Sequence, residues 1–167
     1  MQTGSIPWVI TALRVAVLPF LIISFVLGFT LVSYALFIFA ILTDFLDGYY
    51  AKNFRVASKL GAYFDATADF LFVSAMLSVF VFEGFYSLWL LVLVIVVFVQ
   101  FVLTNIVSRQ AVYDPVGKYY GSLMYGAVGL TLLFQEQPLY EIVTWGIVFS
   151  SAACLVSRAY FLFSRKR

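Results

Sequence analysis

Six long apolar stretches occupy most of this 167-residue chain and constrain its fold more than any other feature. They run over about 6–28, 31–50, 59–82, 86–107, 119–135 and 139–162. Each is about as long as the 17–25 residues that a helix needs to cross the hydrocarbon core of a bilayer. Only 11% of the residues are charged, whereas soluble domains carry about 25%. Because lipid offers the backbone no hydrogen-bond partners, spans of this kind are helical. The sequence therefore predicts an all-α integral membrane protein, a single domain over 1–167 built as a six-transmembrane-helix bundle.

The basic residues lie at or toward one end of the predicted spans, with Arg14 and Arg158 inside the apolar stretches but nearer that end. An even number of spans places both termini on the same side, and this side carries Lys52, Arg55, Lys59, Arg109, Lys118, Arg165, Lys166 and Arg167. The opposite end carries Glu83, Glu136 and Glu141 and no lysine or arginine. By the positive-inside rule, both termini are cytoplasmic in a multi-pass protein of the cell membrane. We expect a retained first span, because no basic segment precedes it. No basic patch separate from this topology suggests nucleic-acid binding.

Four aspartates lie near the cytoplasmic ends of the second and third spans. Asp44 and Asp47 share one face of their helix within an arc of roughly 100°, and Asp65 and Asp69 share one face of the next. The short connection over 52–58 requires an antiparallel hairpin, so the two acidic faces can meet. We therefore expect a polar cavity that opens toward the cytoplasm.

Oxygen ligands without histidine indicate a hard divalent cation at this cavity. Carboxylates that gather within a membrane need a counter-charge, and Mg²⁺, Mn²⁺ and Ca²⁺ prefer such ligands. The chain has no histidine, and its one cysteine, Cys154, is remote, which argues against zinc or copper. Hard metals beside carboxylates suit phosphoryl transfer, in which one carboxylate accepts the proton of the attacking hydroxyl. A polar packing cluster and an ion-transport path are the alternatives.

The acidic segment has a specific pattern, which reads Asp44-x2-Asp47-Gly48-x2-Ala51-Lys52-x8-Gly61-x3-Asp65-x3-Asp69. It resembles the signature of the CDP-alcohol phosphatidyltransferases, D-x2-D-G-x2-A-R-x8-G-x3-D-x3-D, with lysine in place of the arginine. The resemblance implies transfer of a lipid phosphate group from a CDP-linked lipid to a small polar alcohol, with release of CMP, during phospholipid biosynthesis. It also implies a homodimer in the bilayer and a cofactor of two Mg²⁺ or Mn²⁺ ions.

The resemblance also implies a role for each residue of the site. The metal ligands would be Asp44, Asp47, Asp65 and Asp69, and Asp69 would be the catalytic base. The CDP moiety would contact Asp44, Gly48, Ala51, Lys52, Ser58, Gly61 and Thr11. Thr11 enters this set because Pro7, Thr11 and Arg14 share one face of the first span, as in the P-N-x-x-T-x-x-R opening of many family members.

Four basic residues are candidates for binding the acceptor: Arg14, Arg109, Lys118 and Arg158. Arg14 has a second interpretation, pairing with the acidic faces, and a third, extension of its side chain to the interface. Gly117-Lys118 after Arg109 resembles an arrangement in members that make phosphatidylglycerol phosphate. These cations favour glycerol phosphate or inositol phosphate over serine or another unphosphorylated alcohol. A metal- or proton-coupled transporter and an inactive scaffold relative are the alternative classes.

Overall fold

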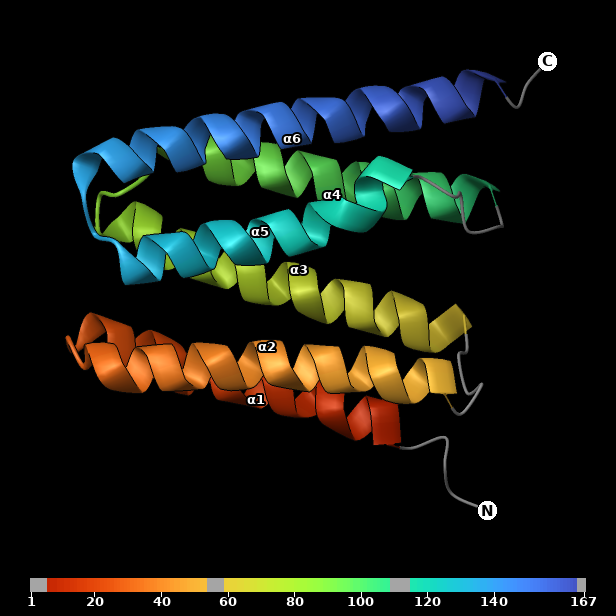
Figure 1. Ribbon diagram of the computed structural model, residues 1–167. Coiled ribbons are helices and arrows are strands. Elements are labelled where there is room, and N and C mark those ends of the chain that lie inside the picture. Colours follow the sequence, from red (N-terminus) through yellow and green to blue (C-terminus); the bar gives the residue numbers. More distant parts are fainter. Residues whose placement is uncertain (1–5, 54–58, 109–114, 165–167) are drawn as a thin grey trace. The chain divides into compact units, whose positions relative to one another are not determined.

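The computed structural model is all-helical over the residues that it describes (Figure 1). These are 6–53, 59–108 and 115–164 for the backbone, and 11–45, 65–104, 117 and 119–160 for the side chains. The helices are α1 (Ile6–Val26), α2 (Thr30–Asn53), α3 (Lys59–Phe82), α4 (Leu88–Ser108), α5 (Pro115–Leu133) and α6 (Gln137–Ser164). Each predicted apolar stretch corresponds to one helix, so the prediction of six helices is confirmed.

Glycines with positive φ end two of the helices. Gly28 has φ of 75° and Gly84 has φ of 80°, a conformation that side chains with a Cβ rarely adopt. After α1 the amide of Phe29 donates to the carbonyl of Ser24 at 2.8 Å, across the Gly28 turn. This is the Schellman arrangement that satisfies the last carbonyls of a helix. The chain therefore reverses sharply, and α2 begins at Thr30.

The internal packing divides the chain into two compact units, 1–72 and 73–167, whose boundary lies within α3. The expectation of one functional domain over 1–167 stays a prediction. The first unit contains α1, α2 and the part of α3 through Phe72. The second contains the rest of α3 and the helices α4, α5 and α6.

In the first unit, α1 packs against α2 in an antiparallel pair. The Oγ atoms of Ser24 and Ser33 lie 2.9 Å apart beside the turn, so the two buried hydroxyls satisfy one another. Leu21 and Ala40 are fully buried. Because the helices run in opposite directions from the turn at Gly28, residues equally far from it lie at the same level. Arg14 precedes Gly28 by 14 residues and Asp44 follows it by 16, so the pair brings these two side chains together.

In the second unit, α4 and α5 each pack against α6. The hydroxyls of Tyr120 and Ser151 lie 2.8 Å apart and join α5 to α6. In the turn after α3, the hydroxyl of Tyr86 lies 2.5 Å from that of Thr131.

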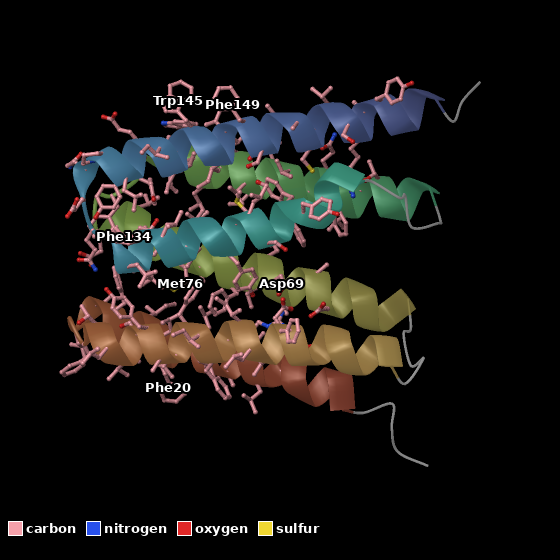
Figure 2. The ribbon with its side chains drawn as sticks, viewed as in Figure 1. Phe20, Asp69, Met76, Phe134, Trp145 and Phe149 are labelled. Atoms are coloured by element: carbon pink, nitrogen blue, oxygen red, sulfur yellow. The ribbon has the colours of Figure 1, made fainter. Side chains whose placement is uncertain are left out.

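Large apolar side chains are exposed on both units. Phe20 is 65% exposed and Phe149 is 68% exposed, and Figure 2 shows Phe20, Trp145 and Phe149 projecting outward from α1 and α6. Exposed apolar surface of this extent is typical of proteins that contact a membrane. Among the residues whose side chains are described, two helices are long and apolar enough to cross one, over Asp65–Phe82 and Gln137–Tyr160. Three more segments of this part of the chain are shorter apolar helices: Thr11–Val26, Thr30–Phe45 and Leu88–Thr104.

Candidate metal centre

Three aspartates of the predicted acidic faces meet within the first unit. Asp44 comes from α2, and Asp65 and Asp69 come from successive turns of α3. Residues four apart in a helix lie on the same face, and Figure 2 shows Asp69 on the side of α3 that faces α2. One carboxylate oxygen of each aspartate lies within 4.8 Å of the others. The two helices therefore gather their acidic groups at one place.

The guanidinium of Arg14, from α1, lies among these three carboxylates. Its Nη2 donates to Oδ1 of Asp44 at 2.7 Å, and its Nη1 donates to Oδ1 of Asp65 at 3.3 Å. Nη1 also donates to Oδ1 of Asp69. The Arg14 side chain is fully buried, whereas those of Asp44, Asp65 and Asp69 are 41%, 40% and 25% exposed. The cluster therefore has a buried positive centre and an acidic rim that solvent can reach.

The donor set of this cluster fits a hard divalent cation. All three ligands are carboxylate oxygens, which Mg²⁺, Mn²⁺ and Ca²⁺ prefer. Two oxygens on opposite sides of such an ion are about 4–5 Å apart, since each metal–oxygen bond is about 2.0–2.5 Å. The spacing of at most 4.8 Å between the oxygens of Asp44, Asp65 and Asp69 is compatible with a shared ion. Their partial exposure leaves the ion a route from solvent.

The remaining residues predicted for the metal and CDP sites are less fully described. Thr11 is 2% exposed and lies one turn before Arg14 in α1. The backbone of Asp47, Gly48, Ala51, Lys52 and Gly61 is helical, whereas their side chains lie outside the described part of the structure. Ser58 lies outside the described residues altogether. Of the predicted metal ligands, the structure thus brings together Asp44, Asp65 and Asp69.

Of the four predicted acceptor contacts, the structure describes the side chains of two. Arg14 pairs with the acidic faces, which was one of its three interpretations. Its complete burial is incompatible with extension to the interface. Lys118 lies in α5 with its side chain undescribed, and Arg109 lies outside the described residues. Binding of acceptor by Arg14, Arg109, Lys118 and Arg158 therefore stays a prediction.

Arg158 lies within the second unit, in surroundings that the sequence did not indicate. It is 2% exposed, its Nη1 donates to Oγ1 of Thr104 at 2.9 Å, and its guanidinium carbon is 4.5 Å from the ring centroid of Phe101. Nearby on α4, the Gln100 side-chain amide donates to the backbone carbonyl of Leu155 at 3.4 Å. A signal in the sequence was Gln100 itself, a polar residue that follows sixteen residues without a charge or amide.

Comparisons with known proteins give a consistent match. The model of a family described as CDP-alcohol phosphatidyltransferase matches residues 4–156. Similar curated proteins include a CDP-diacylglycerol–glycerol-3-phosphate 3-phosphatidyltransferase of Pectobacterium atrosepticum, 36% identical over 89 residues, which are 52% of this chain and 48% of that protein. Proteins of the same name match from Yersinia pestis, 35% identical over 89 residues (52% and 48%), and Salmonella choleraesuis, 36% identical over 88 residues (51% and 48%). The matched part spans about half the length of these curated relatives.

Proposed function

Because this chain belongs to the CDP-alcohol phosphatidyltransferase family, we propose that it transfers the phosphatidyl group of a CDP-linked lipid to an alcohol and releases CMP. The observation that carries the proposal is the meeting of Asp44, Asp65 and Asp69 with oxygens at most 4.8 Å apart. These are three of the four aspartates of the signature, and they lie on two helices. The comparisons do not favour a transporter or an inactive scaffold.

We further propose that the acceptor is glycerol 3-phosphate. The similar curated proteins carry this acceptor in their names. A phosphorylated acceptor is doubly negative and needs cationic partners, for which Arg109, Lys118 and Arg158 are the candidates. Arg14 also pairs with the carboxylates of the cluster, and its predicted contact with the acceptor stays a prediction.

The signature residues around the cluster have proposed roles in binding the CDP moiety. Gly48, Ala51 and Gly61 are small residues at helix positions where a nucleotide could approach the backbone, and Lys52 supplies a positive charge for the diphosphate. Ser58 and Thr11 complete this set. Asp44, Asp47, Asp65 and Asp69 would hold one or two Mg²⁺ or Mn²⁺ ions, which when bound neutralise charge on the phosphate oxygens.

In the proposed reaction, Asp69 acts as the general base. Its carboxylate takes the proton of the acceptor hydroxyl, and the acceptor oxygen forms a bond with the phosphorus that carries the lipid. The bond from this phosphorus to the bridging oxygen of the diphosphate breaks, and CMP leaves with the electron pair. Asp69 is the least exposed of the three carboxylates, at 25% against 40% and 41%, which limits competition from water as a second acceptor.

The acceptor proposal predicts a clear preference in a panel of alcohols. Purified protein with Mg²⁺ and CDP-diacylglycerol should release CMP with glycerol 3-phosphate at a rate at least about tenfold above that with serine, because a site that pairs a phosphate rejects an analogue without one. Inositol phosphate, serine and glycerol form the rest of the panel, and CMP release is measured by chromatography. Equal rates with serine and glycerol 3-phosphate would contradict the acceptor assignment. CMP release with none of the four alcohols would contradict the proposed function.

We propose that all six helices span the membrane, with both termini and the metal centre cytoplasmic. The distribution of basic residues over the sequence supports this orientation. A homodimer is proposed from the family resemblance alone.

Cys154 is the one cysteine of the chain and is 4% exposed, so its replacement by alanine gives a background for labelling single introduced cysteines.

In this background, a membrane-impermeant maleimide should label Glu136→Cys in intact cells. Glu136 is exposed in the turn before α6, on the side that we assign to the cell exterior. Lys166→Cys, near the proposed cytoplasmic terminus, should be labelled only after the membrane is permeabilised. Labelling in the reverse pattern would invert the proposed orientation, and labelling of both in intact cells would contradict a membrane crossing by α6.

A further inference from the structure

We propose that Arg14 is a built-in counter-cation of the aspartate cluster. In this role it is a positioning residue, which holds the three carboxylates together in the metal-free protein and lowers their affinity for divalent metal. The inference rests on the metal role in the proposed function and adds to it a residue outside the Asp44–Asp69 signature. It assigns no contact with substrate to Arg14.

The contacts of Arg14 reach all three helices of the first unit. The residue itself is on α1, Asp44 is on α2, and Asp65 and Asp69 are on α3. Two different guanidinium nitrogens are used, Nη2 for Asp44 and Nη1 for the two aspartates of α3. A planar guanidinium directs its N–H groups along several fixed directions, which the point charge of a lysine cannot do. Arg14 therefore joins carboxylates that would otherwise repel one another.

The charge of the cluster explains why a counter-cation is needed before metal binds. Three ionised carboxylates at most 4.8 Å apart would each raise the free energy of the others. One guanidinium reduces the summed charge of these three side chains from −3 to −2. Arg14 therefore stabilises the cluster without neutralising it, and leaves negative charge for divalent metal.

Arg14 and a bound ion also oppose one another. The guanidinium donates to Oδ1 of each aspartate, one of the two oxygens that each carboxylate could offer to a metal. A dication is repelled by a nearby positive charge twice as strongly as a monovalent ion at the same distance. Asp65 and Asp69 lie one turn apart on α3, so helix geometry keeps these two carboxylates close together without Arg14. Loss of Arg14 removes the repulsion between its guanidinium and the metal ion, and this effect exceeds the loss of carboxylate positioning. The metal affinity of the cluster should therefore rise when Arg14 is replaced.

The test measures Mn²⁺ binding to the purified, substrate-free protein by electron paramagnetic resonance. Arg14→Gln, which removes the charge, should bind Mn²⁺ at least about tenfold more tightly than the wild type. In EDTA the same variant should lose about 5 °C or more in Tm, because its carboxylates lack a counter-cation. Arg14→Lys keeps the charge and should retain a Mn²⁺ affinity near that of the wild type. Glu136→Gln removes an exposed charge in the turn before α6, outside the proposed site, and should leave the Mn²⁺ affinity unchanged.

The outcomes separate this inference from the proposed function. Equal or weaker Mn²⁺ binding by Arg14→Gln, with a wild type that binds Mn²⁺, would overturn the counter-cation role and leave the function standing. A wild type that binds no Mn²⁺ would overturn both. If Arg14→Gln does not fold, the double variant Arg14→Gln/Asp69→Asn tests the counter-cation role instead. Recovery of folded protein on removal of one carboxylate would support the role, and failure to recover would overturn it.

Discussion

Replacing Asp69 by asparagine is expected to reduce CMP release by at least about a thousandfold. The amide cannot accept the proton of the acceptor hydroxyl, and the loss of a positioned general base alone reduces rates by about 10²–10⁴-fold. The shape of the side chain is conserved, and Asp44 and Asp65 keep their places on α2 and α3. The measurement is the initial rate of CMP release with Mg²⁺, CDP-diacylglycerol and glycerol 3-phosphate, compared with that of the wild type.

Nucleotide binding should persist in this variant, within about tenfold of the wild type, because the nucleotide contacts are assigned to other residues and Asp44, Asp47 and Asp65 remain to hold metal. Titration with CMP in Mg²⁺ measures this affinity. Glu136→Gln is the matched control, since it makes the same carboxylate-to-amide change at an exposed position in the turn before α6, and its turnover should equal that of the wild type. If the turnover of Asp69→Asn lies within tenfold of that of the wild type, the assignment of Asp69 as general base is wrong.

Removal of divalent metal is expected to abolish turnover. Without a cation at the carboxylates of Asp44, Asp65 and Asp69, charge on the transferring phosphate is not neutralised, and a reduction of at least about a thousandfold follows. EDTA should reduce CMP release to background, and added Mg²⁺ or Mn²⁺ should restore it. Zn²⁺ should restore little activity, because it prefers nitrogen and sulfur ligands that the cluster does not offer.

A variant of one ligand connects this metal requirement to the cluster. Asp65→Asn removes one negative charge from the aspartate cluster. Because the charge of the ligands sets the metal affinity of oxygen sites, the Mg²⁺ concentration that gives half-maximal turnover should rise by about tenfold or more. Glu136→Gln should leave the Mg²⁺ requirement unchanged. If turnover survives EDTA, or if Asp65→Asn responds to Mg²⁺ as the wild type does, these carboxylates do not hold the catalytic metal.

Much of the helical architecture was predictable because the apolar stretches are long and their ends carry strong local signals. The glycine at the end of the first stretch, Gly28, adopts the positive φ that only such a residue adopts readily. The meeting of Asp65 with Asp69 follows from helical periodicity alone. The approach of Asp44 to both follows from the short hairpin connection between α2 and α3.

The partners of the buried arginines could not be chosen from the sequence. Arg14 lies near the start of a span, and this position is compatible both with pairing to aspartates and with extension of the side chain to the interface. Only the packing of α1 in the first unit selects the pairing with aspartates. For Arg158, the hydrogen bond to Thr104 joins residues 54 positions apart. Neither residue type nor spacing specifies such a contact, since it depends on which faces of α4 and α6 meet.

The burial of Arg14 among carboxylates of later helices has a consequence for biogenesis. When α1 leaves the ribosome, Asp44, Asp65 and Asp69 have not yet been made, and an arginine within a membrane helix costs about 2.5–3.5 kcal/mol at the bilayer centre and less toward the interface. The first helix of the proposed topology thus enters the membrane with an unmatched cation, and the third helix arrives with two unmatched anions. Integration of these helices is then a joint event, completed when the nascent chain has delivered α3 and the opposite charges meet.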